Sequence, residues 1–125
     1  MIHDSAFYAT DISPAALAVA KLNAQRHGVA DHIKFYQGNV LEPLLESRIL
    51  NHESRIVIIA NLPYLNPNEP NGQLRFEPRE ALYAGPNGLD VIKKLLEQVE
   101  SLVTDRRSAA VLLEHAPTQT QKLGQ

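Results

Sequence analysis

The strand-like segment Arg55–Ala60, which after Arg55 is a continuous apolar run, is the feature that most constrains the fold of this chain. Four consecutive residues in it, Ile56–Ile59, are β-branched, and β-branched side chains favour strands over helices. The run does not alternate apolar with polar residues, which is typical of a strand that is buried on both faces at the centre of a parallel sheet. The run therefore predicts a parallel sheet covered by helices on both faces.

The other segments alternate between strand-like and helix-like patterns. A helix is predicted over Ala15–His27. Ser13 is a suitable N-cap for it, Pro14 suits the first helical position, and Gly28 provides a stop. Further strands are expected over Ala6–Thr10, Ile33–Gln37 and Ala109–Glu114, and further helices over Asp90–Val103 and, interrupted near Pro43, over Leu41–Leu50. The Asp90–Val103 helix is expected to have one apolar face, formed by Val91, Ile92, Leu95, Leu96, Val99 and Leu102. This alternation predicts an α/β doubly wound domain.

Two segments are predicted to lack regular structure. Asn61–Leu89 contains five Pro and three Gly and shows no periodicity. Such a long irregular loop is uncommon in a compact domain and usually has a function. The chain from Pro117 onward is polar and is expected to be weakly structured.

Composition narrows the class of protein. The 125 residues suit a single domain, because most domains contain about 100–150 residues, so one domain is expected over 1–125. The absence of Cys excludes disulfides and thiolate nucleophiles. The formal net charge of -2 argues against a broad nucleic-acid-binding surface. No apolar run approaches the roughly 20 residues of a membrane span, so a cytoplasmic protein is expected.

Metal binding is not expected. The histidines lack tight metal-ligand spacing; they are His3, His27, His32, His52 and His115. Gly85–Gly88 is not a phosphate-binding loop either, because no Lys-Ser/Thr pair follows it.

Polar side chains follow three of the predicted strands. Asp11, Asn39 and Asn61 each stand at or just beyond a strand end, which is where doubly wound sheets bind ligands. An acidic residue in this place can accept hydrogen bonds from a ribose diol, so Asp11 suggests a cofactor that contains a nucleoside. Asp11 could instead only assist Ser13 at the start of the next helix.

Asn61-Leu62-Pro63-Tyr64 forms the sharpest local motif. The Asn side chain offers both an acceptor and a donor and can hold a planar amide or amino group. Pro63 biases the backbone before it towards an extended form, which can leave carbonyls free to face a pocket, and Tyr64 adds a flat wall. The alternative interpretation is a strand that ends in a proline turn with a half-buried Tyr.

Several motifs occur together in a fixed order. They are Asp11-Ile12-Ser13-Pro14 followed by Ala16-Leu17, then Asn61-Leu62-Pro63-Tyr64, Phe76-Glu77-Pro78, Ala81-Leu82 and Gly85-Pro86-Asn87-Gly88-Leu89-Asp90. Together they resemble one known family, the S-adenosylmethionine-dependent methyltransferases that modify a glutamine of peptide-chain release factors (HemK/PrmC). The resemblance extends from about Ala6 to Glu114. It implies a Rossmann-like class I methyltransferase fold, with a mostly parallel sheet and helices on both faces, and it makes residues 1–125 a partial catalytic domain.

The resemblance also implies a cofactor site for S-adenosyl-L-methionine. By position, Asp11 would hold the ribose hydroxyls and Ile12 would pack near the adenine. Asn39 would stand where the family usually has an acidic residue that accepts from the adenine amino group, and Val40 beside it would also belong to the cofactor site. Asn61 would also contact the cofactor.

A substrate site is implied by the same motif. Asn61 and the backbone carbonyl of Pro63 would accept hydrogen bonds from the substrate side-chain amide, and Leu62 and Tyr64 would line the pocket. Asn61, Pro63 and Tyr64 are thus the expected catalytic residues, while Glu77 would orient substrate or, in the favoured interpretation, brace the loop. The expected protein partner is a release factor.

Two departures from the family keep other functions open. Asn39 replaces an acidic residue, so cofactor binding is expected to be weaker. Leu62 replaces a Pro, and Asn-Leu-Pro-Tyr also occurs in ribosomal RNA adenine dimethyltransferases. An RNA or DNA amino-methyltransferase and a non-catalytic nucleotide-binding or interaction module therefore remain as alternatives.

The resemblance also indicates family segments that this sequence lacks. They are the N-terminal helical domain, the first strand with its glycine-rich loop, and the C-terminal strand pair, so the chain corresponds to a family member truncated at both ends. The missing strand would lie between the strands that end at Asp11 and Ala60. We expect these strands to pair directly, to leave a gap, or to borrow a strand from a second copy of the chain. We expect the isolated chain to bind cofactor poorly, and its activity is left open.

Overall fold

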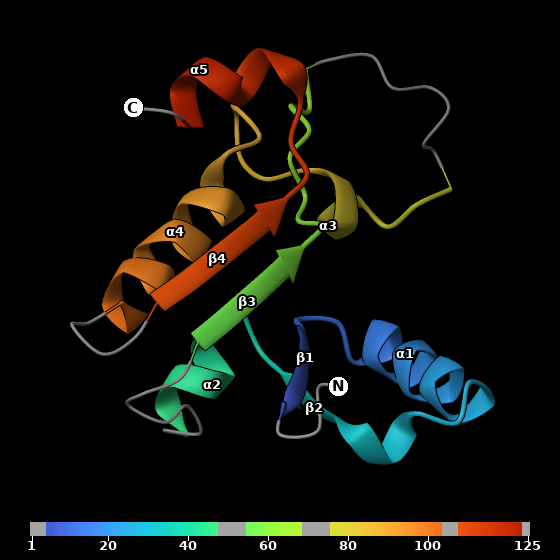
Figure 1. Cartoon of the computed structure of the whole chain (residues 1–125). Helices are drawn as coiled ribbons and strands as arrows, with labels where there is room; N and C mark the ends of the chain where they lie inside the picture. Colours follow the sequence, from blue (N-terminus) through green and yellow to red (C-terminus); the bar gives the residue numbers. More distant parts are fainter. Residues whose placement is uncertain (1–4, 48–54, 69–75, 104–107, 124–125) are drawn as a thin grey trace. The chain divides into compact units, whose positions relative to one another are not determined.

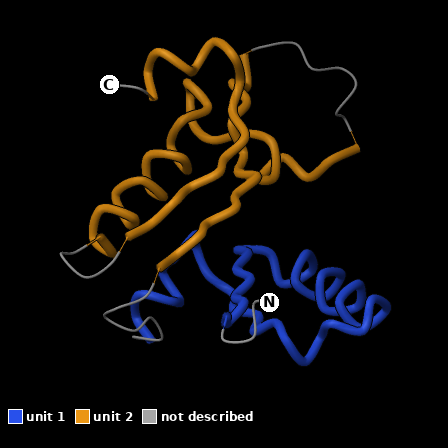
Figure 2. Tube along the Cα trace, in the orientation of Figure 1, with its two compact units in different colours: residues 1–51 blue, residues 52–125 orange. Residues whose placement is uncertain are grey.

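A computed structural model of the chain describes residues 5–47, 55–68, 76–103 and 108–123 (Figure 1). It divides into two compact units, Met1–Asn51 and His52–Gln125 (Figure 2). Each unit contains one two-stranded parallel sheet. The sequence prediction of an α/β chain with parallel strand pairing is therefore confirmed, although the expected single sheet is present as two small ones.

The first unit is built around strands β1 and β2. They pair in parallel, from Phe7 opposite Ile33 to Asp11 opposite Gln37. The elements of this unit are β1 (Phe7–Asp11), α1 (Pro14–Arg26), the short 3₁₀ helix η1 (Ala30–His32), β2 (Ile33–Gln37) and α2 (Glu42–Glu46).

Helix α1 begins and ends as its sequence predicted. The Ser13 hydroxyl accepts a hydrogen bond from the Ala16 amide at 3.2 Å, and Pro14 occupies the first turn. Gly28 follows the helix with a φ of 67°, a left-handed conformation that glycine adopts without a Cβ penalty. The chain can therefore reverse direction and enter β2.

Helix α2 corrects one expectation. Pro43 lies in the first turn of Glu42–Glu46 instead of interrupting a helix. This position needs no amide hydrogen, so proline fits there. Of the predicted segment Leu41–Leu50, residues 48–50 lie outside the described residues.

The second unit is built around strands β3 and β4. They pair in parallel, from Arg55 opposite Ser108 to Ala60 opposite Leu113. The elements of this unit are β3 (Arg55–Ala60), α3 (Arg79–Leu82), α4 (Asp90–Leu102), β4 (Ser108–Leu113), the 3₁₀ helix η3 (Pro117–Gln119) and α5 (Thr120–Leu123).

The prediction that β3 is buried on both faces is wrong for this structure. Burial alternates along the strand, and the exposed fractions of Val57 and Ile59 are 67% and 82%. Leu112 of β4 is 57% exposed on the same side of the sheet. Among the described residues of the second unit no layer covers this face, so within its own unit the strand is covered on one face only.

Helix α4 supplies the centre of the second unit's core, and Figure 1 shows it running along the sheet. Ile92 and Leu95 have no exposed surface, and Leu102 is 3% exposed. Their spacing places them on one helical face, as the sequence predicted. The first residue of the helix is Asp90, and Leu89 occupies the N-cap position before it.

Two segments that were expected to be irregular contain regular structure. Asn61–Leu89 includes α3 and a bridge between Leu65 and Tyr83. The chain after Pro117 forms η3 and α5, and Gln119 is only 6% exposed. These elements were missed because they are too short to show periodicity.

Removing the side chain of Leu95 is expected to destabilise the second unit. A Leu→Ala change at a fully buried position leaves a cavity and costs about 2–5 kcal/mol in the free energy of unfolding. Urea unfolding of Leu95→Ala measures the loss. Lys93→Ala, at an exposed position of the same helix, is the matched control and should change stability little.

Candidate functional site

The carboxyl edge of the β1–β2 sheet gathers four of the predicted cofactor residues, Asp11, Ile12, Asn39 and Val40. Parallel pairing ends at Asp11, whose carbonyl accepts from the amide of Gly38 at 3.0 Å. The Thr10 hydroxyl donates to the Val40 carbonyl at 2.7 Å. These hydrogen bonds draw the segment after β2 against the end of β1, so the strand-end residues share one edge.

The Asp11 carboxylate has two possible roles in this edge. Its Oδ1 accepts from the Ser13 amide at 2.8 Å, which supports the start of α1 as the alternative interpretation required. Within the described residues its Oδ2 has no hydrogen-bond partner. Ile12 beside it is 58% exposed and offers an apolar surface. The geometry therefore leaves one carboxylate oxygen available to a ligand.

The segment after β2 contains a backbone conformation that is energetically unfavourable. Val40 has a φ of 56°, which is rare for a β-branched residue and costs of order 1–3 kcal/mol. A Cβ on Gly38 would overlap the Pro43 ring, so only glycine allows this close approach. Strained backbone of this kind is often found at ligand sites, which fits the predicted place of Asn39 and Val40.

In the second unit, Asn61 and Glu114 lie at the ends of paired strands. The Glu114 amide donates to the Ala60 carbonyl at 3.3 Å and extends the ladder by one residue. Asn61 is exposed, and within the described residues neither its side chain nor the Pro63 carbonyl has a hydrogen-bond partner. Both acceptors that the motif predicted are therefore available to a substrate.

The Tyr64 phenol is braced by Glu114. Its hydroxyl donates to Glu114 Oε1 at 3.0 Å. This hydrogen bond is the main cause that raises the pKa of Tyr64 above its ordinary value of 10.0, followed by burial and by the negative charges of Glu114 and Glu77. The phenol is therefore neutral at physiological pH and acts as a fixed wall and hydrogen-bond donor.

The remaining predicted substrate residues lie in the same unit. Leu62 and Pro63 are half-buried, and Glu77 is exposed. The charge of Glu77 acts on Tyr64 through space and contributes to its raised pKa. The predicted substrate residues thus all belong to the second unit, whereas Asp11, Ile12, Asn39 and Val40 belong to the first.

The turn at Gly85–Gly88 packs tightly against the Asn61–Tyr64 loop. Both glycines have positive φ, 72° and 69°. A Cβ on Gly88 would overlap the Tyr64 carbonyl, so the turn can approach the loop only because this residue lacks a side chain. The sequence pattern identified this turn as part of the family resemblance without assigning it a contact.

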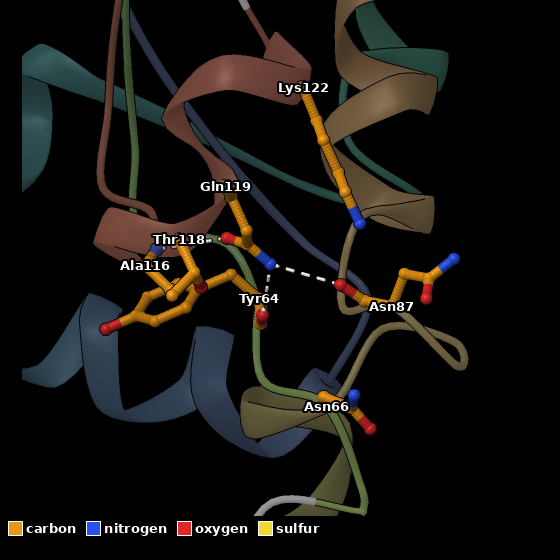
Figure 3. Close-up of a pocket in the computed structure, with 7 residues that line it drawn as sticks. All are labelled: Tyr64, Asn66, Asn87, Ala116, Thr118, Gln119 and Lys122. Carbon is orange, nitrogen blue, oxygen red and sulfur yellow. Dashed lines mark hydrogen bonds between the residues drawn. The ribbon is translucent and has the colours of Figure 1, made fainter.

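Sequence reasoning missed the side chain that joins these loops, Gln119. It is buried, and its Nε2 donates to the Tyr64 carbonyl at 2.8 Å and to the Asn87 carbonyl at 3.2 Å (Figure 3). A pocket of about 190 Å³ opens beside it, lined by Tyr64, Asn66, Asn87, Ala116, Thr118, Gln119 and Lys122. Its position in a polar, aperiodic tail gave no signal of burial.

The described residues contain neither a metal-binding cluster nor a membrane-spanning helix. No group of three or more His, Cys, Asp or Glu side chains is arranged there to hold a metal ion. His3 and His52 lie outside the described residues. No helix in the described ranges has the length and apolar character to cross a membrane.

Comparison with known proteins identifies the family. A family of RMKL-like methyltransferase domains matches residues 2–116. The release factor glutamine methyltransferase of Moorella thermoacetica is 41% identical over 100 residues, which are 77% of this chain and 33% of that protein. That of Coxiella burnetii is 34% identical over 116 residues, 92% of this chain and 39% of that protein.

A ribosomal relative matches to a similar extent. The ribosomal protein uL3 glutamine methyltransferase of Burkholderia pseudomallei is 35% identical over 101 residues, 78% of this chain and 33% of that protein. The chain belongs to the HemK/PrmC-like family of protein glutamine methyltransferases, as its motifs predicted. It spans about a third of the length of the curated relatives it matches.

The pKa of Tyr64 is expected to fall in the variant Glu114→Gln, because a neutral amide accepts a weaker hydrogen bond from the hydroxyl and removes the charge that disfavours the phenolate. Alkaline titration of tyrosine absorbance, with Tyr64→Phe to assign the signal, measures the shift. The control Glu97→Gln, at an exposed position of α4, should leave the titration unchanged.

The same shift has a consequence for stability. Because the folded pKa lies above the unfolded value of about 10, the contribution of Tyr64 to stability is fully present below pH 10 and is lost as the pH rises through the folded pKa. A Tyr64 titration that is identical in Glu114→Gln would contradict the assigned hydrogen bond.

Proposed function

We propose that this chain contributes to methyl transfer from S-adenosyl-L-methionine to the side-chain amide nitrogen of a protein glutamine, and that a peptide-chain release factor is the substrate. The observation that carries the proposal is the pair of unengaged acceptors, Asn61 and the Pro63 carbonyl, beside a braced Tyr64 in a member of this family. The release factor is preferred because relatives of that name match 77% and 92% of the chain.

The two acceptors suit the two hydrogens of a primary amide. The Asn61 side-chain oxygen and the Pro63 carbonyl would each accept one N–H, which fixes the plane and rotation of the substrate amide. The neutral Tyr64 ring would close one side of the site, and its hydrogen bond to Glu114 keeps it from rotating away. Leu62 would add apolar contact to the methylene groups of the glutamine.

The chemistry needs positioning more than acid or base catalysis. An amide nitrogen is a weak nucleophile because its lone pair is delocalised into the carbonyl. Acceptors on both N–H groups polarise the nitrogen and hold it on the line of attack. Asn61 and the Pro63 carbonyl would hold the nitrogen in line with the methyl group that bound S-adenosyl-L-methionine would supply, and the methylated nitrogen would release one proton to solvent.

The edge after β1 and β2 fits the nucleoside end of the cofactor. The available Asp11 Oδ2 can accept from a ribose hydroxyl, and the exposed Ile12 can pack on a flat ring. The Asn39 oxygen can accept from an adenine amino group, without the charge assistance that an acid gives. When bound, the cofactor supplies an activated sulfonium methyl group.

Ribosomal protein uL3 is the second candidate substrate. The relative of that name is 35% identical to this chain, within the range of the release factor relatives. The acceptors at Asn61 and Pro63 would contact only the side-chain amide of the glutamine, so they suit a glutamine in either protein. Choice between the two proteins would rest on surfaces outside this motif.

Substitution of Asp11 is expected to weaken cofactor binding. Asp11→Asn keeps an oxygen for the Ser13 amide but removes the charge that strengthens a bond to the ribose, so affinity should fall about tenfold. Calorimetric titration of the chain with S-adenosylmethionine measures this. Asp31→Asn, at an exposed position of η1, is the matched control. Equal affinities in both variants would argue against a ribose site at Asp11.

Substitution of Asn61 is expected to reduce methyl transfer. Asn61→Ala removes one acceptor from the substrate amide, and the rate should fall by about 10²-fold. Mass spectrometry of release factor and of uL3 after incubation with the chain measures the transfer. Asn23→Ala, at an exposed position of α1, should retain full activity. Methylation of RNA and of neither protein would contradict the proposal.

A further inference from the structure

Gln119 joins three segments that are far apart in the sequence. Its Nε2 donates to the carbonyls of Tyr64 at 2.8 Å and Asn87 at 3.2 Å, with Gly88 further away at 3.5 Å. Its Oε1 accepts from the Ala116 amide at 3.0 Å. One carboxamide therefore ties the loop after β3, the Gly85–Gly88 turn and the chain after β4 to one another.

The burial of Gln119 makes these bonds informative. The residue is 6% exposed, and a buried amide is stable only when its donors and acceptor are satisfied. A carboxamide has two N–H hydrogens and an oxygen that accepts, and all three are used here. Figure 3 shows the amide nitrogen directed at Tyr64 and Asn87.

Gly88 restrains Tyr64 from a second direction. The glycine backbone lies so close to the Tyr64 carbonyl that a Cβ would overlap it. The carbonyl is thus held between the Gln119 amide and the Gly88 backbone. The peptide that carries it joins Tyr64 to Leu65, and the Pro63 acceptor is one peptide earlier. A shift of Tyr64 would therefore move the acceptor as well.

We propose that Gln119 is a positioning residue that holds the Asn61–Tyr64 loop in the conformation that receives the substrate amide. This inference rests on the proposed function. Gln119 itself does not touch the substrate in this scheme; it acts through the Tyr64 carbonyl and through the turn at Gly88.

The test replaces the carboxamide without adding charge. Gln119→Met keeps the length and much of the volume of the side chain but removes both donors. Gln119→Asn, whose amide is one methylene shorter, is a second and milder variant. Gln121→Met is the matched control, because Gln121 is exposed and lies two residues further along the chain, in α5. All are made in the full chain and checked for folding by circular dichroism.

Two readouts separate positioning from a general loss of stability. The first is the alkaline titration of Tyr64, which reports on the loop in folded molecules and needs no activity. We expect its pKa to fall towards the ordinary value in Gln119→Met, because the hydrogen bond to Glu114 depends on where the loop holds the ring. A residue that only stabilised the fold would leave this titration unchanged.

The second readout is the rate of methyl transfer to release factor at saturating substrate. We expect the turnover number to fall about 10- to 100-fold in Gln119→Met, because small misplacements of the acceptors cost this much, while S-adenosylmethionine affinity stays unchanged. Gln121→Met should match the unsubstituted chain in both readouts.

The outcomes distinguish this inference from the proposed function. An unchanged Tyr64 titration, or a normal turnover number, in the Gln119 variants would overturn the positioning role. Absence of transfer by the unsubstituted chain would contradict the proposed function instead, and the Tyr64 titration would still decide whether Gln119 holds the loop.

Discussion

The parallel register of β3 and β4 is the constraint on which the second unit's site depends. Ala60 pairs with Leu113, so the chain leaves both strands at one edge, and the next residues there are Asn61 and Glu114. Any other register would carry Glu114 away from Tyr64 by a full residue spacing, about 3.3 Å, and break their hydrogen bond. The backbone ladder thus sets the side-chain geometry of the site.

In each unit the irregular backbone that follows a strand is held in place by close contacts, and these contacts differ between the two units. In the first, a left-handed Val40 and the close contact of Gly38 with Pro43 fix the chain after β2. In the second, two left-handed glycines and the amide of Gln119 fix the chain after β3. In both, irregular backbone is held at a strand end by contacts that only a small residue or a buried amide permits.

The sequence predicted the features that are local or repetitive. The strand at Arg55–Ala60, the cap at Ser13 and the apolar face of α4 all depend on neighbouring residues, and each is confirmed within a residue or two. The exposed face of β3 and the burial of Gln119 were missed. Both depend on which distant segment covers a residue, and no periodicity records that.

A site that acts by positioning its substrate requires a rigid loop. The proposed methyl transfer to an amide needs no proton shuttle, so the loop would need acceptors in fixed places more than reactive side chains. One of the proposed acceptors, the Pro63 carbonyl, belongs to the backbone and does not depend on the side chain of the neighbouring Leu62. The loop does depend on the contacts that hold its backbone in place. The contacts that Gln119 and Gly88 make with the Tyr64 carbonyl provide that support within the described residues.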